Sequence, residues 1–196
     1  LAWLVITLVY RIRPTGLENI PDKGPAIVVC NHVSFLDPII LAGSVRRPMR
    51  FVMWYKIFQM PILNFIFRTM KCIPIAGARE DPKIMEEAFA AVDMELAAGN
   101  IVCIYPEGGI TRDGEIARFR PGIERIIEKR PVPVIPVAMG RLWGSWFSRR
   151  RDGGLRRIPG RMFARVPIRF GKPVPATQVT AAKLELLVRA LRGEDR

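Results

Sequence analysis

The chain of 196 residues contains one histidine and three cysteines, and these scarcities limit its chemistry. Because His32 is the only histidine, any acid–base chemistry by an imidazole must use it. Cys30, Cys72 and Cys103 include no CxxC pair and no metal-like spacing, so we expect buried, reduced thiols. The sequence therefore predicts neither a disulfide framework nor a metal site.

Long hydrophobic runs are also absent, because no apolar stretch reaches the roughly 20 residues with which a helix crosses a bilayer. Residues 1–10 are apolar and are followed by Arg11 and Arg13. We predict a membrane-proximal segment over residues 1–13, either an interfacial helix or the end of a longer membrane segment. The basic region and cleavage site of a signal peptide are both missing.

Acidic residues are few, with 18 Asp and Glu against 31 Lys and Arg, a formal charge of +13. This balance predicts polyanionic partners. Hydrophobic residues make up 49% of the chain and its mean hydropathy is +0.15, which favours an anionic membrane surface over nucleic acid. No nucleic-acid-binding motif is present, and we predict no nucleic-acid partner.

Aromatic residues and arginines alternate over residues 141–169, where Trp143, Trp146 and Phe163 are prominent. We interpret this stretch as a basic aromatic interfacial region that docks on anionic lipid, the alternative being a solvated basic loop.

Short β-branched runs alternate with helical patterns along the chain. The expected strands are Ala26–Cys30, Phe51–Met53, Cys72–Ile75, Ile101–Tyr105 and Val134–Val137. The expected helices are Ile39–Val45, Pro82–Ala98, Pro121–Lys129 and Ala181–Leu191, while the nearly all-apolar Lys56–Phe67 predicts core packing or a groove wall. We predict a single α/β domain over residues 1–196, with a central, mostly parallel sheet flanked by helices.

The first polar cluster sets Asp37 five residues beyond His32, directly after an apolar run. In a continuous helix this spacing would turn the two side chains about 140° apart, so a bend is implied if they meet. Such a pair could serve as a general base whose ring is oriented by the carboxylate. Alternatively, Asp37 before Pro38 is a typical helix N-cap, and His32 is an ordinary polar residue.

The second cluster runs from Tyr105 to Arg112 and again follows an apolar run. Gly108 and Gly109 allow backbone N–H groups to approach an anion closely, although a tight turn needing positive φ explains them equally well. Glu107 would hold this loop or the substrate. Because functional loops lie at strand ends, the two clusters predict one site.

Asn31-His32-x4-Asp37 and Tyr105-Pro106-Glu107-Gly108 resemble the first and third signature blocks of the glycerolipid acyltransferases, the 1-acylglycerol-3-phosphate acyltransferase family. Pro133–Val137 resembles the fourth block. The resemblance implies transfer of a fatty acyl group from an acyl-coenzyme A or acyl-carrier-protein thioester to a lysophospholipid hydroxyl, without another cofactor. It also implies membrane association, at the cytoplasmic face of the inner or plasma membrane.

In that reaction the resemblance makes His32 the base and Asp37 its orienting carboxylate, with no acyl-enzyme. The residues expected to bind substrate are Asn31, Glu107, Gly108, Gly109 and Arg112. Ser34 lies beside the pair, but the chain lacks a GxSxG motif, so we expect Ser34 to be structural.

The third block departs from the family's Pro-Glu-Gly-Thr-Arg-Ser, because Gly109-Ile110 intervene before Thr111-Arg112. Arg112 is therefore the candidate for binding the acceptor phosphate, with Arg118 and Arg120 as rivals. The form Pro-Glu-Gly-x-Ile-Thr more closely resembles lysophosphatidylethanolamine-type acyltransferases fused to transporters. Phosphatidic acid synthesis is the leading hypothesis; a lysophosphatidylethanolamine-like acceptor and a non-catalytic basic lipid-binding module are the alternatives.

Overall fold

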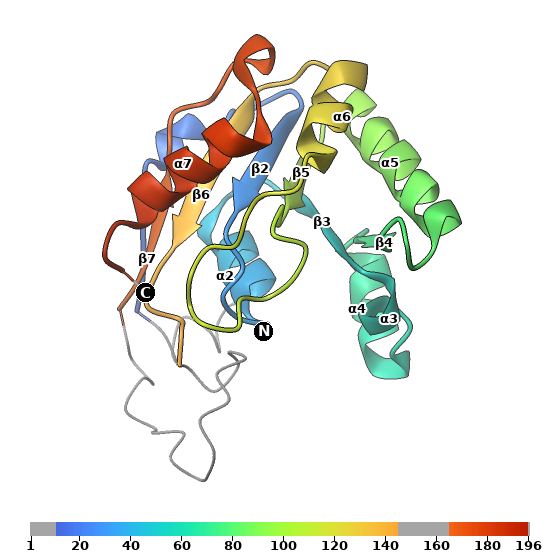
Figure 1. The fold of residues 1–196 in the computed structure, drawn as a ribbon, viewed down its shortest axis with the longest axis horizontal. Helices are drawn as coiled ribbons and strands as arrows, with labels where there is room; N and C mark the ends of the chain where they lie inside the picture. The colour runs from blue at the N-terminus through green and yellow to red at the C-terminus, as the bar shows by residue number, and fades with distance from the viewer. Residues whose placement is uncertain (1–10, 145–164, 196) are drawn as a thin grey trace, which may run out of the picture.

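The computed structural model describes residues 11–144 and 165–195, with the backbone alone at residues 61–63. These residues form a seven-stranded sheet with helices on both faces (Figure 1). In sheet order the strands are β1 (Arg11–Thr15), β7 (Arg165–Phe170), β6 (Val134–Met139), β2 (Ala26–Cys30), β5 (Ile101–Ile104), β3 (Met49–Trp54) and β4 (Ile73–Ile75). The strands from β6 to β4 are parallel, and β7 is antiparallel to β6. The predicted α/β fold with a mostly parallel sheet is confirmed.

Four of the six α-helices in the described residues occur where the sequence predicts helices, and the other two lie mainly in the apolar segment for which no helix was predicted. The six helices are α2 (Asp37–Ser44), α3 (Tyr55–Phe58), α4 (Pro61–Thr69), α5 (Pro82–Ala97), α6 (Gly122–Lys129) and α7 (Ala181–Arg192), with short 3-10 turns at Leu17–Asn19 and Ala176–Gln178. At the start of α5 the Asp81 carboxylate accepts hydrogen bonds from the N–H groups of Lys83 and Ile84. Gly99, at φ +78°, follows the end of α5 in a conformation that disfavours other residues.

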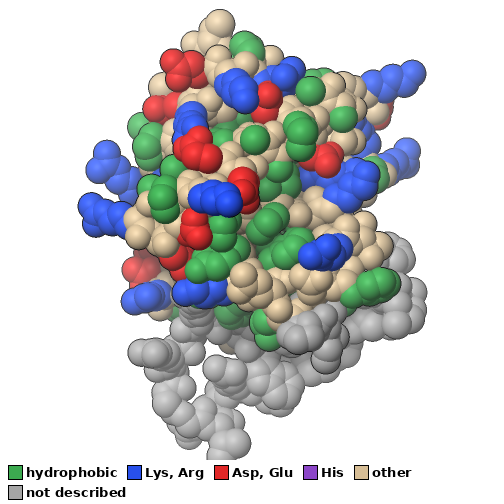
Figure 2. All heavy atoms as spheres, turned by 90° about the vertical axis from the view of Figure 1, so that its right-hand side faces the viewer, with side chains coloured by type: hydrophobic (Ala, Val, Ile, Leu, Met, Phe, Trp, Pro, Cys, Tyr) green, Lys and Arg blue, Asp and Glu red, His purple; other side chains and the backbone are tan. Residues whose placement is uncertain are grey.

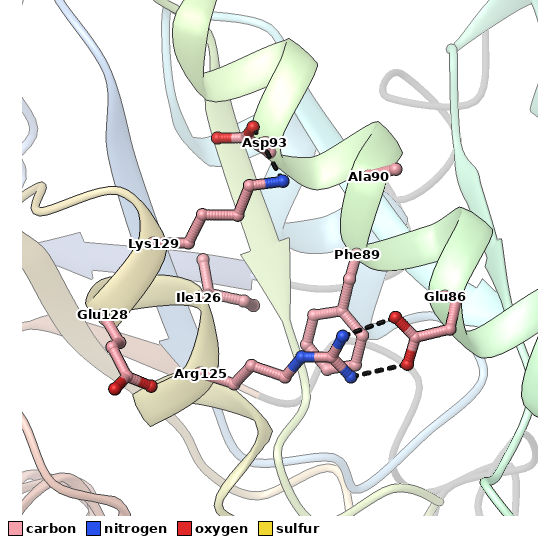
Figure 3. A pocket seen from close by; sticks show the side chains of 8 residues that line it. All are labelled: Glu86, Phe89, Ala90, Asp93, Arg125, Ile126, Glu128 and Lys129. Carbon is pink, nitrogen blue, oxygen red and sulfur yellow. Dashed lines mark hydrogen bonds and ion pairs between the residues drawn. The ribbon is translucent and has the colours of Figure 1, made fainter.

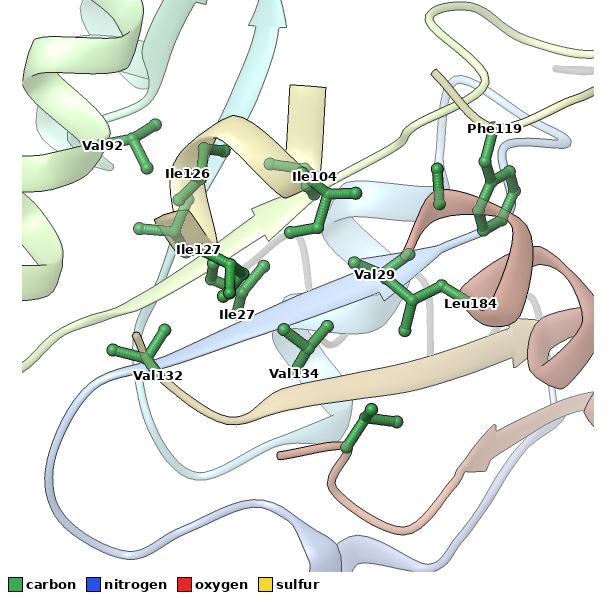
Figure 4. Close-up of a cluster of buried hydrophobic side chains, with 14 of the residues drawn as sticks. Ile27, Val29, Val92, Ile104, Phe119, Ile126, Ile127, Val132, Val134 and Leu184 are labelled. Carbon is green, nitrogen blue, oxygen red and sulfur yellow. The ribbon is translucent and has the colours of Figure 1, made fainter. Parts of the chain in front are cut away.

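Side-chain alternation along the central strands builds a core on each face of the sheet. Val28 and Cys30 of β2 pack against α2 on one face. Ile27 and Val29 point to the other face, which α5, α6 and α7 cover (Figure 4). Burial on both faces explains why β2 is a continuous apolar run with no polar alternation.

Two strands lie where the sequence analysis expected membrane-associated segments. Arg11 and Arg13 belong to β1, which pairs in parallel with β7, and residues 1–10 lie outside the described part. Within the predicted interfacial region, Val166 and Ile168 of β7 are buried in the core. That prediction was therefore wrong for β7, because the pairing partners are 154 residues apart (165 − 11) and no local pattern reveals them. Residues 145–164, including Trp146 and Phe163, lie outside the described residues.

The apolar segment Lys56–Phe67 is not core throughout. It folds as α3 and α4, and Met60, Phe65 and Ile66 expose 51%, 76% and 45% of their surface. Phe58 and Phe67 pack inward against the core. No helix in the described ranges is long and apolar enough to cross a membrane.

Candidate active site

The imidazole of His32 and the carboxylate of Asp37 are in direct contact. Nδ1 of His32 lies 2.8 Å from Oδ2 of Asp37, and Asp37 is fully buried whereas the His32 side chain keeps 17% of its surface exposed. For Nε2, the contacts among the described residues include no hydrogen bond. This arrangement suits a general base: the carboxylate orients the ring through one nitrogen, while the other can take a proton from a bound hydroxyl.

A sharp turn after β2 brings the two side chains together, as their spacing required. Oδ2 of Asp37 also accepts hydrogen bonds from the backbone N–H groups of Val33, at 2.6 Å, and Ser34, at 2.9 Å. Asp37 is the first residue of α2, and its side chain makes no capping bond to that helix. The simple N-cap interpretation is therefore wrong, since the carboxylate points back to the loop that carries His32.

The loop after β5 lies against the His32 loop, because β2 and β5 are adjacent parallel strands whose carboxyl ends meet (Figure 1). Oε1 of Glu107 accepts the backbone N–H of His32 at 2.7 Å, and Oε2 accepts that of Ala117 at 2.8 Å. The N–H of Thr111 donates to the carbonyl oxygen of His32 at 2.9 Å. Both predicted clusters thus form one site, and Glu107 positions the catalytic loop.

Burial shapes the electrostatics of Glu107. Its side chain is largely removed from water, which raises its pKa from 4.5 to about 7, although the two N–H donors oppose that rise. Near neutral pH this carboxyl is therefore close to half protonated. Because the backbone N–H of His32 donates to this carboxyl, protonation of Glu107 would weaken that hydrogen bond.

Gly108 combines a positive φ of +75° with a close approach by Arg120. A Cβ atom on Gly108 would lie 2.4 Å from Cζ of Arg120, so the guanidinium packs directly on the glycine backbone. The N–H of Gly108 donates to the Tyr105 carbonyl within the turn, which leaves the N–H of Gly109 as the anion donor of the predicted pair. Gly109 is exposed and has open space around it.

Among the three arginines considered for the acceptor phosphate, Arg120 lies at the Pro-Glu-Gly loop. Its backbone N–H also donates to the Pro106 carbonyl, at 2.9 Å. Arg112 is exposed, and Arg118 interacts electrostatically with Glu185 on α7. Arg120 is thus the arginine that lies against Gly108, while the choice of arginine for the phosphate stays a prediction.

Asn31 precedes His32 in the chain, and Tyr105 contacts the His32 ring. The amide of Asn31 is buried and exchanges two hydrogen bonds with the backbone of Met139 on β6, at 2.9 and 2.8 Å. These contacts give Asn31 a positioning role at the end of β2. The ring of Tyr105 stacks on that of His32, with centroids 4.2 Å apart, and sequence analysis missed this contact because only its place at a strand end hinted at it.

Three nucleophilic side chains near His32 are buried. Ser34 is fully buried and its Oγ accepts the N–H of Leu36. Cys30 and Cys103 are buried free thiols, and burial raises the pKa of both well above the usual value, so they stay protonated at neutral pH. Ser34, Cys30 and Cys103 therefore present no exposed nucleophile beside His32. Within the described ranges, no group of three His, Cys, Asp or Glu side chains is arranged to hold a metal.

A separate hollow lies between α5 and α6 (Figure 3). Arg125 pairs with Glu86 across it and packs on the Phe89 ring, while Lys129 pairs with Asp93. None of the residues that line it belongs to the two loops of the site. The hollow therefore lies where α5 and α6 pack together, and ion pairs join the two helices there.

The chain belongs to the Acyltransferase family, whose model matches residues 11–140. A chloroplast 1-acyl-sn-glycerol-3-phosphate acyltransferase of Arabidopsis thaliana is 32% identical over 131 residues, covering 66% of this chain and 36% of that protein. The enzyme of the same name from Pseudomonas aeruginosa is 31% identical over 137 residues, covering 68% of this chain and 51% of that one. This chain therefore spans only about a third to a half of these relatives.

The fold is also similar to that of a solved structure, the 1-acyl-sn-glycerophosphate acyltransferase of Thermotoga maritima. The TM-score is 0.74 at 22% identity, over 96% of this chain and 74% of the other. At this identity the likeness supports the fold alone.

Proposed function

We propose that this protein transfers a fatty acyl group from an acyl thioester to the free hydroxyl of 1-acylglycerol-3-phosphate, forming phosphatidic acid at a membrane surface. The observation that carries this proposal is the contact between His32 and the buried carboxylate of Asp37. Family membership and the activities named for its relatives support the reaction class. The donor is a thioester of coenzyme A or acyl carrier protein, and the location is the cytoplasmic face of the inner or plasma membrane.

In the proposed reaction, Nε2 of His32 takes the proton from the acceptor hydroxyl as its oxygen attacks the thioester carbonyl carbon. Asp37 stabilises the imidazolium that forms. The tetrahedral intermediate then collapses, the carbon–sulfur bond breaks, and His32 returns the proton to the departing thiolate. Gly109 is exposed beside this site, and its N–H can stabilise an anion there.

The acceptor phosphate is assigned to Arg120. Its guanidinium packs on Gly108 at the mouth of the loop, and an arginine can bind a phosphate through two parallel hydrogen bonds. The positive charge of the chain further favours an anionic acceptor.

A lysophosphatidylethanolamine-like acceptor is the second candidate, and one observation favours it. Ile110 occupies the position at which the family's usual third block has arginine, and Ile110 is buried. The loop therefore lacks one cation that this block ordinarily supplies.

An acyl-transfer assay with purified protein, long-chain acyl-coenzyme A and a panel of lysophospholipids tests the proposal. We expect the highest kcat/KM with 1-acylglycerol-3-phosphate, and a loss of roughly 10² to 10⁴ in rate for His32→Ala, as for removal of a general base. Preference for lysophosphatidylethanolamine would favour the second candidate. Product formation by His32→Ala at the normal rate would rule out this mechanism, whereas no product from the wild type with any lysophospholipid would favour the non-catalytic lipid-binding module.

A further inference from the structure

The stretch from Pro38 to Arg79 contains no acidic residue, although the whole chain has 18. Its cations are Arg46, Arg47, Arg50, Lys56, Arg68, Lys71 and Arg79. These cations all lie after the end of α2, between Arg46 and the turn that follows β4, and β3 and β4 are the last two strands at one edge of the sheet.

Three of these cations have partners. Arg47 donates to backbone carbonyl oxygens, Arg50 pairs with Glu95 and Lys56 pairs with Glu80. Arg68 and Lys71, at the end of α4, are exposed, and the described residues include no ion pair for either. Their charge is therefore directed to solvent.

The same region carries an unusual share of exposed apolar surface. Eight large hydrophobic side chains are exposed in the described residues, and four of them lie between the end of β3 and the end of α4: Trp54, Met60, Phe65 and Ile66. We call Met60, Phe65, Ile66, Arg68 and Lys71 the α3–α4 surface. Figure 2 faces this side of the molecule, and hydrophobic side chains gather there in the lower part, at the height of α3 and α4 in Figure 1.

The opposite side of α4 packs on the same core cluster as residues of the candidate site. Phe67 and Met70 pack against the core cluster on which Tyr105 and Leu36 also pack. In Figure 1, α3 and α4 lie below β4 at the right-hand edge, while α2 and the loop after β5 lie below the middle of the sheet. Phe35, next to the buried Ser34 in the catalytic loop, is itself 49% exposed.

We propose that the α3–α4 surface docks on an anionic lipid bilayer, with Phe65 and Ile66 below the headgroups and Arg68 and Lys71 on lipid phosphates. A short amphipathic helix with apolar and cationic residues on its outer side suits the plane of a bilayer interface. Trp54 at the border of the surface suits the headgroup level.

Charge complementarity favours a bilayer over a second copy of the chain. A symmetric dimer through this surface would bring Arg68 and Lys71 close to the same cations of the other copy, with no acidic residue between Pro38 and Arg79 to offset them. Anionic lipid supplies the missing negative charge.

Co-sedimentation of the full chain with phosphatidylglycerol–phosphatidylcholine vesicles tests this proposal without acyl transfer, so its failure is separate from failure of the proposed function. We expect Phe65→Ser with Ile66→Ser to weaken partitioning roughly tenfold, since both lose apolar surface for insertion. The matched control is Leu186→Ser, because Leu186 is 68% exposed on α7, across the sheet.

A second experiment tests the role of charge with two double variants. The first carries Arg68→Gln and Lys71→Gln together, and the control carries Lys23→Gln and Lys172→Gln together. We expect roughly a tenfold loss for the first pair on anionic vesicles, little loss for the control pair, and weak binding of all proteins to neutral vesicles. Circular dichroism and thermal unfolding confirm that each variant is folded.

Unchanged binding by both α3–α4 variants would overturn the proposal. If binding were instead lost on replacing Arg149, Arg150 and Arg151 with glutamine, the segment at residues 141–169 would be the docking region. If Phe65→Ser changed the sedimentation coefficient from dimer to monomer and left vesicle binding intact, the surface would be an interface between two copies.

Discussion

The two loops of the candidate site are ordered in different ways. In the loop after β2, the Asp37 carboxylate bonds residues three to five positions earlier, including His32. The loop after β5 is longer, and Glu107 orders it through bonds to Ala117, 10 residues away, and to His32, 75 residues away. The first loop is therefore ordered mainly by contacts between neighbouring residues, whereas the second depends on contacts with residues far away in the sequence.

The largest effect on activity should come from replacing Asp37 in the loop after β2. Asp37→Asn keeps an oxygen that can accept the N–H groups of Val33 and Ser34, but it removes the charge that stabilises the imidazolium. We expect kcat to fall by roughly 10² to 10⁴ with little change in Tm. Steady-state kinetics and calorimetry measure both quantities.

Asp37→Ala is the matched variant, because it also removes the acceptor of two buried N–H groups. It should lower the free energy of unfolding by about 1 to 3 kcal/mol for each N–H left unpaired. Near-normal turnover by Asp37→Asn would show that the pair is not catalytic.

The structure of the second loop can be tested with Gly108→Ala, and Gly109→Ala is the control. A Cβ on Gly108 would clash with Arg120 and would stand on a backbone with φ +75°, while one on Gly109 would meet nothing within 4 Å. We expect Gly108→Ala to cost about 1 to 2 kcal/mol in backbone strain, with a loss of activity, and Gly109→Ala to have a smaller effect. Equal activity in the two variants would show that the Arg120 contact is unimportant.

Arg120→Ala sharpens the comparison by separating loop structure from substrate binding. If Arg120 binds the acceptor phosphate, the lost contact is worth about 1.5 to 3 kcal/mol, or roughly a 10- to 100-fold rise in the KM of the lysophospholipid. The KM of the thioester should change little. Arg112→Ala and Arg118→Ala are the controls, and a KM effect confined to either would move the assignment to that residue.

The smallest effect concerns the pH dependence of Glu107. Because its pKa is raised from 4.5 to about 7 in the folded protein, folding takes up protons between these values. This group therefore makes the free energy of unfolding decrease as pH rises from about 4.5 to about 7, by about 1 to 3 kcal/mol. Urea unfolding of wild type and Glu107→Gln at pH 5 and pH 7.5 measures the difference, and a decrease of the same size in both proteins would refute the assignment.

The fold class and the central strands were predictable because their information is local. The run Ala26–Cys30 has the length and β-branched content of a buried strand, and it forms β2 with those bounds. Helix α5 likewise forms at Pro82–Ala97, within one residue of the predicted bounds, with Asp81 as its N-cap. The strands β1 and β7, which lie side by side at one end of the sheet, were not predictable, because Arg11–Thr15 and Arg165–Phe170 pair with each other across nearly the whole length of the chain.

The same distinction holds within the candidate site. The sequence by itself determined the His32–Asp37 pair and the presence of the Pro-Glu-Gly loop, because a five-residue spacing with a bend and a glycine pair are local features. Only the tertiary structure decided that Glu107 bonds the His32 backbone, that Tyr105 stacks on His32 and that Arg120, not Arg112, lies on Gly108. These contacts join residues brought together by the parallel pairing of β2 and β5 and by the path of a 17-residue loop from 105 to 121, and hydrophobic periodicity carries no information on either.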